Sequence, residues 1–182
     1  MMSSFNTQPT LENEFIKIVP LKEEDFEILY AIASDPLIWE QHPNKDRYKR
    51  EVFETFFRGA MASKGAFLVY DAKSGKAIGS SRYYEADPEH KTIVIGYTFL
   101  ARDHWGGIYN PALKALMLEY AFTSFDAVLL HIGAHNLRSQ KAAERIGAKK
   151  IGELEMAYYG EANKLNFVYE IRKADWLAAS HP

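Results

Sequence analysis

The sequence predicts one mixed α/β domain, in which a mostly antiparallel central sheet contains a βαβ unit and is flanked by helices. Three observations support this fold class. Short apolar runs separated by turn residues follow one another in the first half of the chain, a strand, helix and strand pattern spans residues 93–134, and no linker, repeat or low-complexity tract divides the sequence. The 182 residues are 47% hydrophobic, which is enough for a single core. We expect a flexible segment over residues 1–14 and one domain over residues 15–178.

The first half of the chain is expected to form one strand, two helices and an antiparallel meander. Residues 15–19 are a short apolar strand that Pro20 closes. Apolar residues three and four apart predict helices over residues 23–33 and about 47–62. The meander that follows comprises strands at residues 66–70, 77–84 and 92–100, with turns at residues 73–76 and 85–91.

The second half is expected to form a βαβ unit followed by a helix and a hairpin. The helix that starts at Asn110 leads to a buried strand at residues 128–134, and the crossover rule makes this strand parallel to the one at residues 92–100. A second helix spans residues 137–146, with Asn136 as its N-cap and Gly147 as the left-handed residue that ends it. The final strands, residues 150–154 and 164–171, are joined through residues 159–163.

The glycine turn between the first parallel strand and its helix is the strongest functional signal. Gly106 and Gly107 let the backbone approach a ligand closely. Asn110 is a favourable N-cap, and Pro111 suits the first helical position because its missing N–H has no partner there. The unpaired N–H groups and positive end of the helix therefore predict a pocket for an anion such as phosphate.

Composition excludes several other classes of function. A net charge of -2 with dispersed lysines and arginines gives no basic patch for nucleic acid. The chain has no cysteine, and its six histidines lack the spacing of a zinc protease helix, so we expect no metal. Residues 1–10 are polar and no apolar run approaches the length of a membrane span. We expect a cytoplasmic protein with no membrane partner.

Four motifs in order carry a resemblance to a known family. They are Gly96-Tyr97 in a strand, Trp105-Gly106-Gly107 before a helix, Asn136-Leu137-Arg138-Ser139 opening the next helix, and Arg145-Ile146-Gly147-Ala148 closing it. This series resembles the GNAT superfamily of acetyl-CoA-dependent N-acetyltransferases, closest to the branch containing the ribosomal-protein N-terminal alanine acetyltransferases. The likeness extends from Phe15 to about Trp176 and implies the GNAT fold.

The resemblance also implies how acetyl-CoA is held. Backbone amides of the turn at residues 102–110 would bind the pyrophosphate, and the strand end at residues 99–101 would pair with the pantetheine arm. Asn136 would face pantetheine, with Ser139 one helical turn on, although ordinary helix capping explains this pair equally well. The implied cofactor-binding residues are Phe99, Leu100, Ala101, Arg102, Trp105, Gly106, Gly107, Ile108, Tyr109, Asn110, Asn136 and Ser139.

The sequence departs from the family at several positions. Asp103 and Ile108 replace residues of the usual phosphate loop, and Val94 and Ala112 stand where near relatives often have glutamate. Residues 141–143 lie where many members have the tyrosine that protonates the leaving thiolate. No obvious general acid is present.

Acetyl transfer requires a neutral amine, so a group must take its proton. We consider Glu85, His104 and Ser139 as catalytic candidates, together with His42, although His42 also fits a loop histidine and His104 also fits a residue packed on the turn. A backbone N–H near Phe99 or Leu100 would stabilise the oxyanion.

The resemblance therefore implies an N-acetyltransferase that moves the acetyl group to a primary amine, either a peptide N-terminus or a small molecule. Two alternatives stay open. One is a GNAT-fold protein that binds acyl-CoA without catalysis, since the two glutamates are missing. The other is a nucleotide-dependent oxidoreductase, which the absence of Gly-x-Gly-x-x-Gly disfavours. The C-terminal hairpin is a candidate for pairing between subunits in a homodimer.

Overall fold

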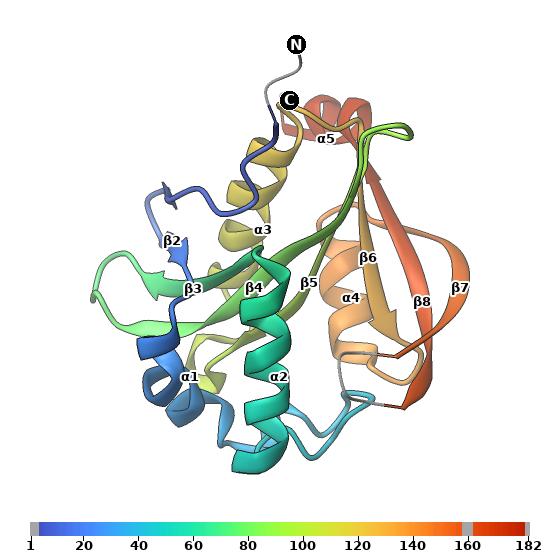
Figure 1. The fold of residues 1–182 in the computed structure, drawn as a ribbon. Helices are drawn as coiled ribbons and strands as arrows, with labels where there is room; N and C mark the ends of the chain where they lie inside the picture. Colours follow the sequence, from blue (N-terminus) through green and yellow to red (C-terminus); the bar gives the residue numbers. More distant parts are fainter. Residues whose placement is uncertain (1–3, 158–161, 181–182) are drawn as a thin grey trace.

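The computed structural model describes residues 4–157 and 162–180, and its centre is one eight-stranded sheet (Figure 1). The strand order is β1-β2-β3-β4-β5-β6-β8-β7, and every neighbouring pair is antiparallel except the parallel pair β5 and β6. The strands are β1 (Leu11–Glu12), β2 (Ile16–Pro20), β3 (Ala66–Asp71), β4 (Ala77–Asp87), β5 (Thr92–Leu100), β6 (Ala127–Gly133), β7 (Lys149–Ala157) and β8 (Asn163–Arg172). The predicted fold class, antiparallel meander and βαβ unit are confirmed.

Helices cover both faces of this sheet. The α-helices are α1 (Phe26–Ala33), α2 (Arg50–Ser63), α3 (Tyr109–Ala121), α4 (Leu137–Arg145) and α5 (Lys173–Ser180). Single 3-10 turns are η1 (Glu23–Asp25), η2 (Pro36–Ile38) and η3 (Arg102–His104). In Figure 1, α2 crosses one face of the sheet and α3 lies behind the other.

The core is accordingly divided into two layers by the sheet. One layer joins α1 and α2 to the sheet and includes Leu29, Phe53 and Phe99. The other layer holds α3 and α4 and includes Leu113 and Ala143. Each layer buries apolar side chains that alternate along the strands, as expected for a sheet covered on both sides.

The two parallel strands separate soon after they meet. Only Thr92–Val94 of β5 pair with β6, and their partners are Ala127–Leu129. Beyond these residues, β5 continues to Leu100 and β6 to Gly133 without pairing to each other. The pairing of β5 with β4 is also interrupted, because its register shifts between Phe99 and Gly96. Tyr97, within this irregularity, has a φ of 53°, which is unusual for a residue other than glycine. We refer to this irregularity at residues 97–98 as the β5 bulge. The separation of β5 from β6 leaves a gap beside it.

Several predicted boundaries need correction. Asn110 is not the N-cap of α3: the helix starts at Tyr109, and the Ala112 N–H already bonds to the Ile108 carbonyl, so Ile108 is the N-cap. Pro111 still lies in the first turn, where a missing N–H leaves no helical bond unmade. The Asn136 cap and the left-handed Gly147, with a φ of 92°, are confirmed.

Both chain ends carry structure outside the predicted strands and helices. The segment expected to be flexible packs on the domain over its described part, since β1 pairs with β2 and Phe5 contacts the rings of Tyr83, Tyr120 and Phe125. Helix α5 was not predicted. Part of the proposed connection at residues 159–163 lies outside the described residues. In the described ranges, no helix has the length and apolar character needed to cross a membrane.

Candidate functional site

A cleft of about 470 Å³ occupies the gap where β5 and β6 separate. Its walls are Ile95–Leu100 of β5 and Leu130–Gly133 of β6, the turn before α3, and the facing sides of α3 and α4. The loop between α1 and α2 contributes Trp39, His42 and Arg47. The cleft is therefore made by the strand split itself and reaches both layers of the fold.

The glycine turn is held in place by specific contacts. Trp105 donates its indole N–H to the Leu100 carbonyl over 2.8 Å. Tyr109 donates its hydroxyl to Asp71 Oδ2 over 3.1 Å, and His104 Nε2 lies 3.5 Å from the same oxygen. Burial would raise the Asp71 pKa, but the donors around its carboxylate outweigh that effect and hold the pKa at about 2. This anion anchors the turn to the end of β3.

Gly106 has a backbone conformation that other residues rarely adopt. Its φ is 72°, whereas its neighbour Gly107 does not have a positive φ. A Cβ atom at either glycine would meet no atom within 4 Å, so no other residue covers the turn here, and both glycines line the cleft. The turn can therefore present backbone N–H groups to an anion at the start of α3.

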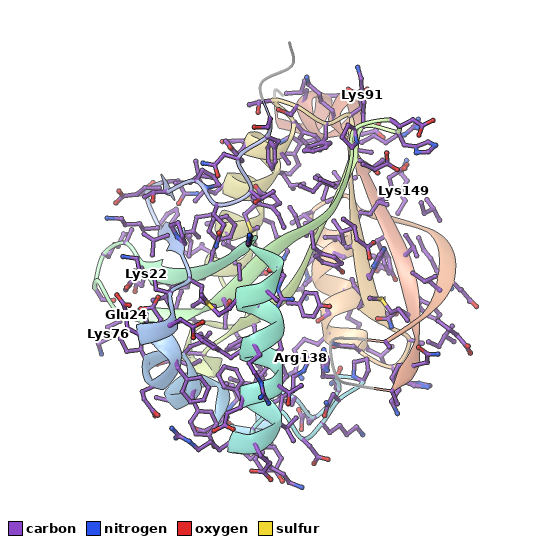
Figure 2. All side chains as sticks on the ribbon, in the orientation of Figure 1. Lys22, Glu24, Lys76, Lys91, Arg138 and Lys149 are labelled. Carbon is purple, nitrogen blue, oxygen red and sulfur yellow. The ribbon has the colours of Figure 1, made fainter. Side chains whose placement is uncertain are left out.

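The electrostatic character of the cleft also favours an anionic ligand. No Asp or Glu is among its lining residues in the part of the chain described by the structure, whereas Arg47, Lys114, Arg138 and Arg145 are. Arg138, at the start of α4 (Figure 2), lies with its guanidinium carbon 4.0 Å from the Trp105 ring centre. A ligand that carries phosphate groups fits these residues.

The structure brings most of the predicted cofactor-binding residues to the cleft. Those that line it are Phe99, Leu100, Trp105, Gly106, Gly107, Asn110, Asn136 and Ser139. Ala101, Arg102, Ile108 and Tyr109 lie in the same turn but outside the lining. Arg102 instead pairs with Asp35, and the Ile108 side chain is exposed.

Asn136 and Ser139 have an identifiable structural role. The Asn136 Oδ1 accepts the Ser139 backbone N–H over 3.3 Å, which is the predicted helix cap. Both residues also border the cleft. The capping bond uses the Ser139 backbone and involves no Ser139 hydroxyl.

The predicted catalytic candidates occupy different environments. Glu85 is exposed at the far part of β4 and does not line the cleft. His104 lines the cleft, but its Nδ1 lies 2.7 Å from Asp103 Oδ1 and its ring packs on Tyr109. These contacts fit the alternative in which His104 packs on the turn. His42 Nδ1 accepts the Asn44 backbone N–H, and its Nε2 lies 3.2 Å from Arg47 Nη1. Burial lowers the His42 pKa well below 6.5.

Two ionisable residues of the cleft, His131 and Lys114, were not among these candidates. His131 lies between Leu130 and Ile132, which face the α3 layer, so its side chain points toward the opposite layer. There its Nδ1 lies 3.4 Å from the Tyr84 hydroxyl. Burial lowers the His131 pKa, and the charge of Glu85 partly opposes that change. The imidazole is thus neutral at pH 7.

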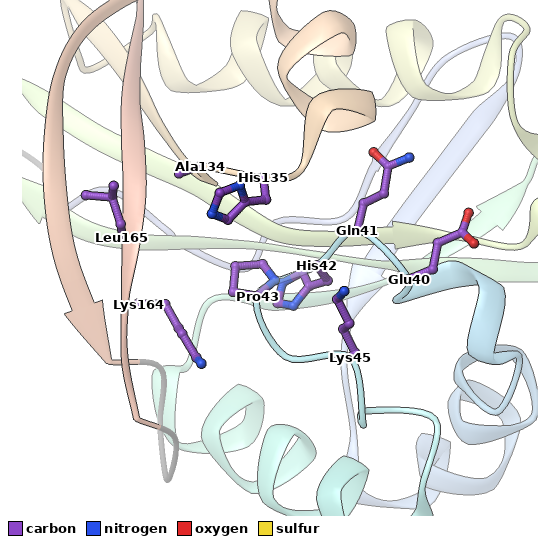
Figure 3. Close-up of a pocket in the computed structure, with 9 residues that line it drawn as sticks. All are labelled: Glu40, Gln41, His42, Pro43, Lys45, Ala134, His135, Lys164 and Leu165. Carbon is purple, nitrogen blue, oxygen red and sulfur yellow. The ribbon is translucent and has the colours of Figure 1, made fainter.

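A second cavity of about 520 Å³ adjoins the site (Figure 3). The loop before α2 supplies Glu40, His42 and Lys45, and the far wall includes His135 and Lys164. His42 lines both this cavity and the cleft. A molecule in the second cavity would therefore lie beside the open side of the strand split.

Comparisons with known proteins agree with this fold. The family model described as "Acetyltransferase (GNAT) domain" matches residues 16–149. No curated protein sequence matches the chain. A GCN5-related N-acetyltransferase from Brucella melitensis superposes with a TM-score of 0.78 at 22% identity, over 94% of this chain and 81% of that one.

Two further solved structures contain CoA ligands. RimJ of Mycobacterium smegmatis in complex with CoA-disulfide has a TM-score of 0.68 at 16% identity, covering 91% of this chain and 88% of that one. The spermidine N-acetyltransferase from Vibrio cholerae in complex with CoA and spermine has a TM-score of 0.63 at 19% identity, covering 91% and 99%. These likenesses support the fold, and the family match covers more than half of the sequence. The chain belongs to the GNAT acetyltransferase family.

Proposed function

We propose that this protein is an N-acetyltransferase that transfers the acetyl group of acetyl-CoA to a primary amine. The observation that carries the proposal is the split between β5 and β6, which joins a cation-lined cleft to a second cavity through His42. Such an arrangement lets a donor and an acceptor meet from opposite layers of the sheet. Bringing two reactants together in this way can lower a barrier by roughly 7 to 11 kcal/mol.

The cosubstrate would be held by the turn and the start of α4. Backbone N–H groups at Gly106 and Gly107 and the Arg138 guanidinium would bind phosphate oxygens. The strand end at residues 99–101 would pair with the pantetheine amides. When bound, acetyl-CoA supplies a thioester that is reactive toward amines. The predicted backbone N–H near Phe99 or Leu100 would stabilise the carbonyl oxygen, directly after the irregular backbone at residues 97–98.

His131 is the proposed base. Its neutral imidazole can donate Nδ1–H to the Tyr84 hydroxyl and keep a lone pair on Nε2 for an amine proton. Its side chain points toward the layer that contains the α1–α2 loop. This position suits it better than Glu85, whose charge acts on His131 from the surface.

The acceptor is proposed to enter through the second cavity. Glu40 in its wall provides a negative charge for an ammonium group, although Glu40 also lies 3.7 Å from Arg138. Both acceptor classes considered from the sequence stay open: a peptide N-terminus, as in the ribosomal-protein branch, and a small-molecule amine. The Vibrio cholerae structure with spermine illustrates the second class on the same fold.

Two further features of the proposal concern the surroundings of the enzyme. We retain a cytoplasmic location from the sequence. We also retain a homodimer, because β7 is an edge strand and the terminal hairpin exposes Ile151, Leu154 and Leu165. Sedimentation of the purified protein would test whether it is a dimer.

Calorimetric titration with acetyl-CoA is the first experiment, with Gly106→Glu as the blocked variant. Gly75→Glu is the matched control, because Gly75 has a φ of 74° and an equally open Cβ direction but lies in the β3–β4 turn outside the cleft. We expect binding by the wild type and by Gly75→Glu, and loss in Gly106→Glu. Absence of wild-type binding would overturn the proposal.

A panel of primary amines then tests turnover by the appearance of free thiol. The chain contains no cysteine, so the protein adds no thiol background. Turnover with one class of amine supports the proposal and identifies the acceptor. Binding of acetyl-CoA without transfer to any amine would instead support the non-catalytic acyl-CoA-binding alternative.

A further inference from the structure

Lys114 is a buried cation that projects from α3 into the cleft. Its side chain is 8% exposed, and its Nζ donates to Thr98 Oγ1 over 2.8 Å. Thr98 Oγ1 lies 2.8 Å from Ser81 Oγ, which is fully buried in β4. The chain of contacts Lys114–Thr98–Ser81 therefore links α3, β5 and β4 directly beside the β5 bulge.

Among the described residues, none supplies this ammonium with an opposite charge. In the described residues its single hydrogen bond goes to a neutral hydroxyl, which leaves two of its three donors for another group. The ionisable residues that line the same cleft are Arg47 from the loop, His42 beside it, His104 from the turn, Tyr97 from β5, His131 from β6, and Arg138 and Arg145 from α4. None is a carboxylate. Burial alone lowers the Lys114 pKa to about 8.

Holding α3 against β5 does not require a lysine. Thr98 and Ser81 already form a hydrogen bond with each other, and α3 contributes Leu113 and Met117 to the core. A buried ammonium without a carboxylate destabilises a fold. Such a group is expected where a negative charge arrives with a ligand or develops during a reaction.

We propose that the Lys114 ammonium donates the proton taken up by the sulphur of CoA during acetyl transfer. This inference rests on the proposed function. In the step, the amine nitrogen forms a bond to the acetyl carbon, the carbon–sulphur bond breaks, and its electron pair stays on sulphur. Sulphur takes a proton from Lys114 Nζ, the nitrogen loses its proton to His131, and water restores both side chains.

The opposite placement of the two groups supports these roles. Lys114 approaches the β5–β6 gap from the α3 layer, whereas His131 faces the layer of α1 and α2. A proton can therefore leave the amine on one side of the sheet while another is delivered on the other. Residues 141–143, where the family often has tyrosine, offer no hydroxyl for this task.

The test compares Lys114→Met, which keeps a flexible apolar side chain but removes the ammonium, with Lys114→Arg, which keeps the charge but does not release a proton. Lys76→Met is the control, since Lys76 is an exposed residue of the β3–β4 turn (Figure 2). Thermal unfolding checks that each variant is folded. With an amine accepted by the wild type, kcat should fall about a hundred-fold or more in both Lys114 variants. It should be unchanged in Lys76→Met.

A second readout needs no acceptor amine. The ultraviolet absorbance of the thiolate, recorded as the difference between bound CoA and bound desulfo-CoA, gives the pKa of the bound thiol. We expect the wild type to lower this pKa relative to free CoA and Lys114→Met to restore it. The wild-type kcat should also decline above about pH 8, with that decline lost in Lys114→Met.

The outcomes separate the two proposals. If the wild type transfers acetyl to no amine, the acetyltransferase proposal fails. If the wild type is active while either Lys114 variant keeps full kcat, or while Lys114→Met leaves the bound thiol pKa unchanged, only the role of Lys114 is overturned. Should Lys114→Met not fold, Lys114→Arg decides the question alone, because full activity there excludes proton donation by residue 114.

Discussion

The Arg138 guanidinium stacks on the Trp105 ring, with 4.0 Å between the guanidinium carbon and the ring centre. Because Trp105 is itself bonded to the Leu100 carbonyl, this contact joins the start of α4 to the end of β5 across the mouth of the cleft. Stacking fixes the plane of the guanidinium, so its donors are arranged in advance for a phosphate.

Replacing Arg138 with glutamine should weaken acetyl-CoA binding by about ten- to a hundred-fold, because a charge-assisted hydrogen bond contributes roughly 1.5 to 3 kcal/mol. Calorimetry measures the change. Arg58→Gln is the control, since Arg58 is exposed on α2 and bonds to Thr55. Equal affinities of Arg138→Gln and the wild type would contradict a phosphate contact at this position.

Gly106 should be sensitive to alanine for a conformational reason. Gly106→Ala forces a Cβ onto a backbone with a φ of 72°, which should destabilise the turn by about 1 kcal/mol and weaken acetyl-CoA binding several-fold. Gly107→Ala should leave affinity almost unchanged. Gly75→Ala, with a φ of 74°, should lower the melting temperature without affecting binding. If Gly75→Ala impaired binding equally, general destabilisation would explain the result.

Local patterns predicted most of the fold. Helical spacing located α1 and α2, and apolar runs located β3, β5 and β6, because each pattern reflects which face of one element is buried. The N-cap Asn136 and the terminating Gly147 located α4. The Asn110 cap was misplaced by two positions because Ile108, an unfavourable capping residue, starts the helix. Phe5 is the one hydrophobic side chain over residues 3–10, so the sequence alone did not indicate its packing on Tyr83, Tyr120 and Phe125.

The site was predicted less completely than the fold. The glycine turn is continuous in sequence and could be identified, whereas His131 and Lys114 each lie inside an apolar stretch. Alternation along β6 was a usable signal for His131, since it places residue 131 opposite Leu130 and Ile132. For Lys114, only the spatial position of Thr98 reveals the contact. The split of β5 from β6 is likewise a tertiary property that no local pattern specifies.

His131 should determine the acidic side of the pH profile. Since burial lowers its pKa below 6.5, the wild type should retain activity to below pH 6.5 and lose it as the imidazole gains a proton. His131→Gln should reduce kcat/KM about a hundred-fold and remove this dependence. His90→Gln is the control, because His90 is exposed and pairs with Asp87. If the pH dependence of activity were unchanged in His131→Gln, His131 would not be the base, and water would take the proton of the amine.

Lys114 should also reduce the stability of the fold, and the effect should depend on pH. Its pKa falls from 10.5 to about 8 on folding, so between these values the unfolded chain binds more protons than the folded one. Wild-type stability relative to Lys114→Met should therefore be lowest below pH 8 and should recover as pH rises toward 10.5. At pH 7 the variant should be more stable, on the order of 1 to 3 kcal/mol after loss of the Thr98 hydrogen bond.

Urea unfolding of the wild type and Lys114→Met at pH 7, 9 and 10.5 measures this difference. If the ammonium is buried without a countercharge, the difference in the free energy of unfolding between the two proteins should become smaller as the pH rises. Two outcomes would contradict this expectation: a difference in unfolding free energy that does not change with pH, or a Lys114→Met variant that is less stable than the wild type at pH 7. Either would mean that Lys114 stabilises the packing of α3 on β5. A variant that is more stable but slower would instead show that the fold accommodates this cation for its chemistry.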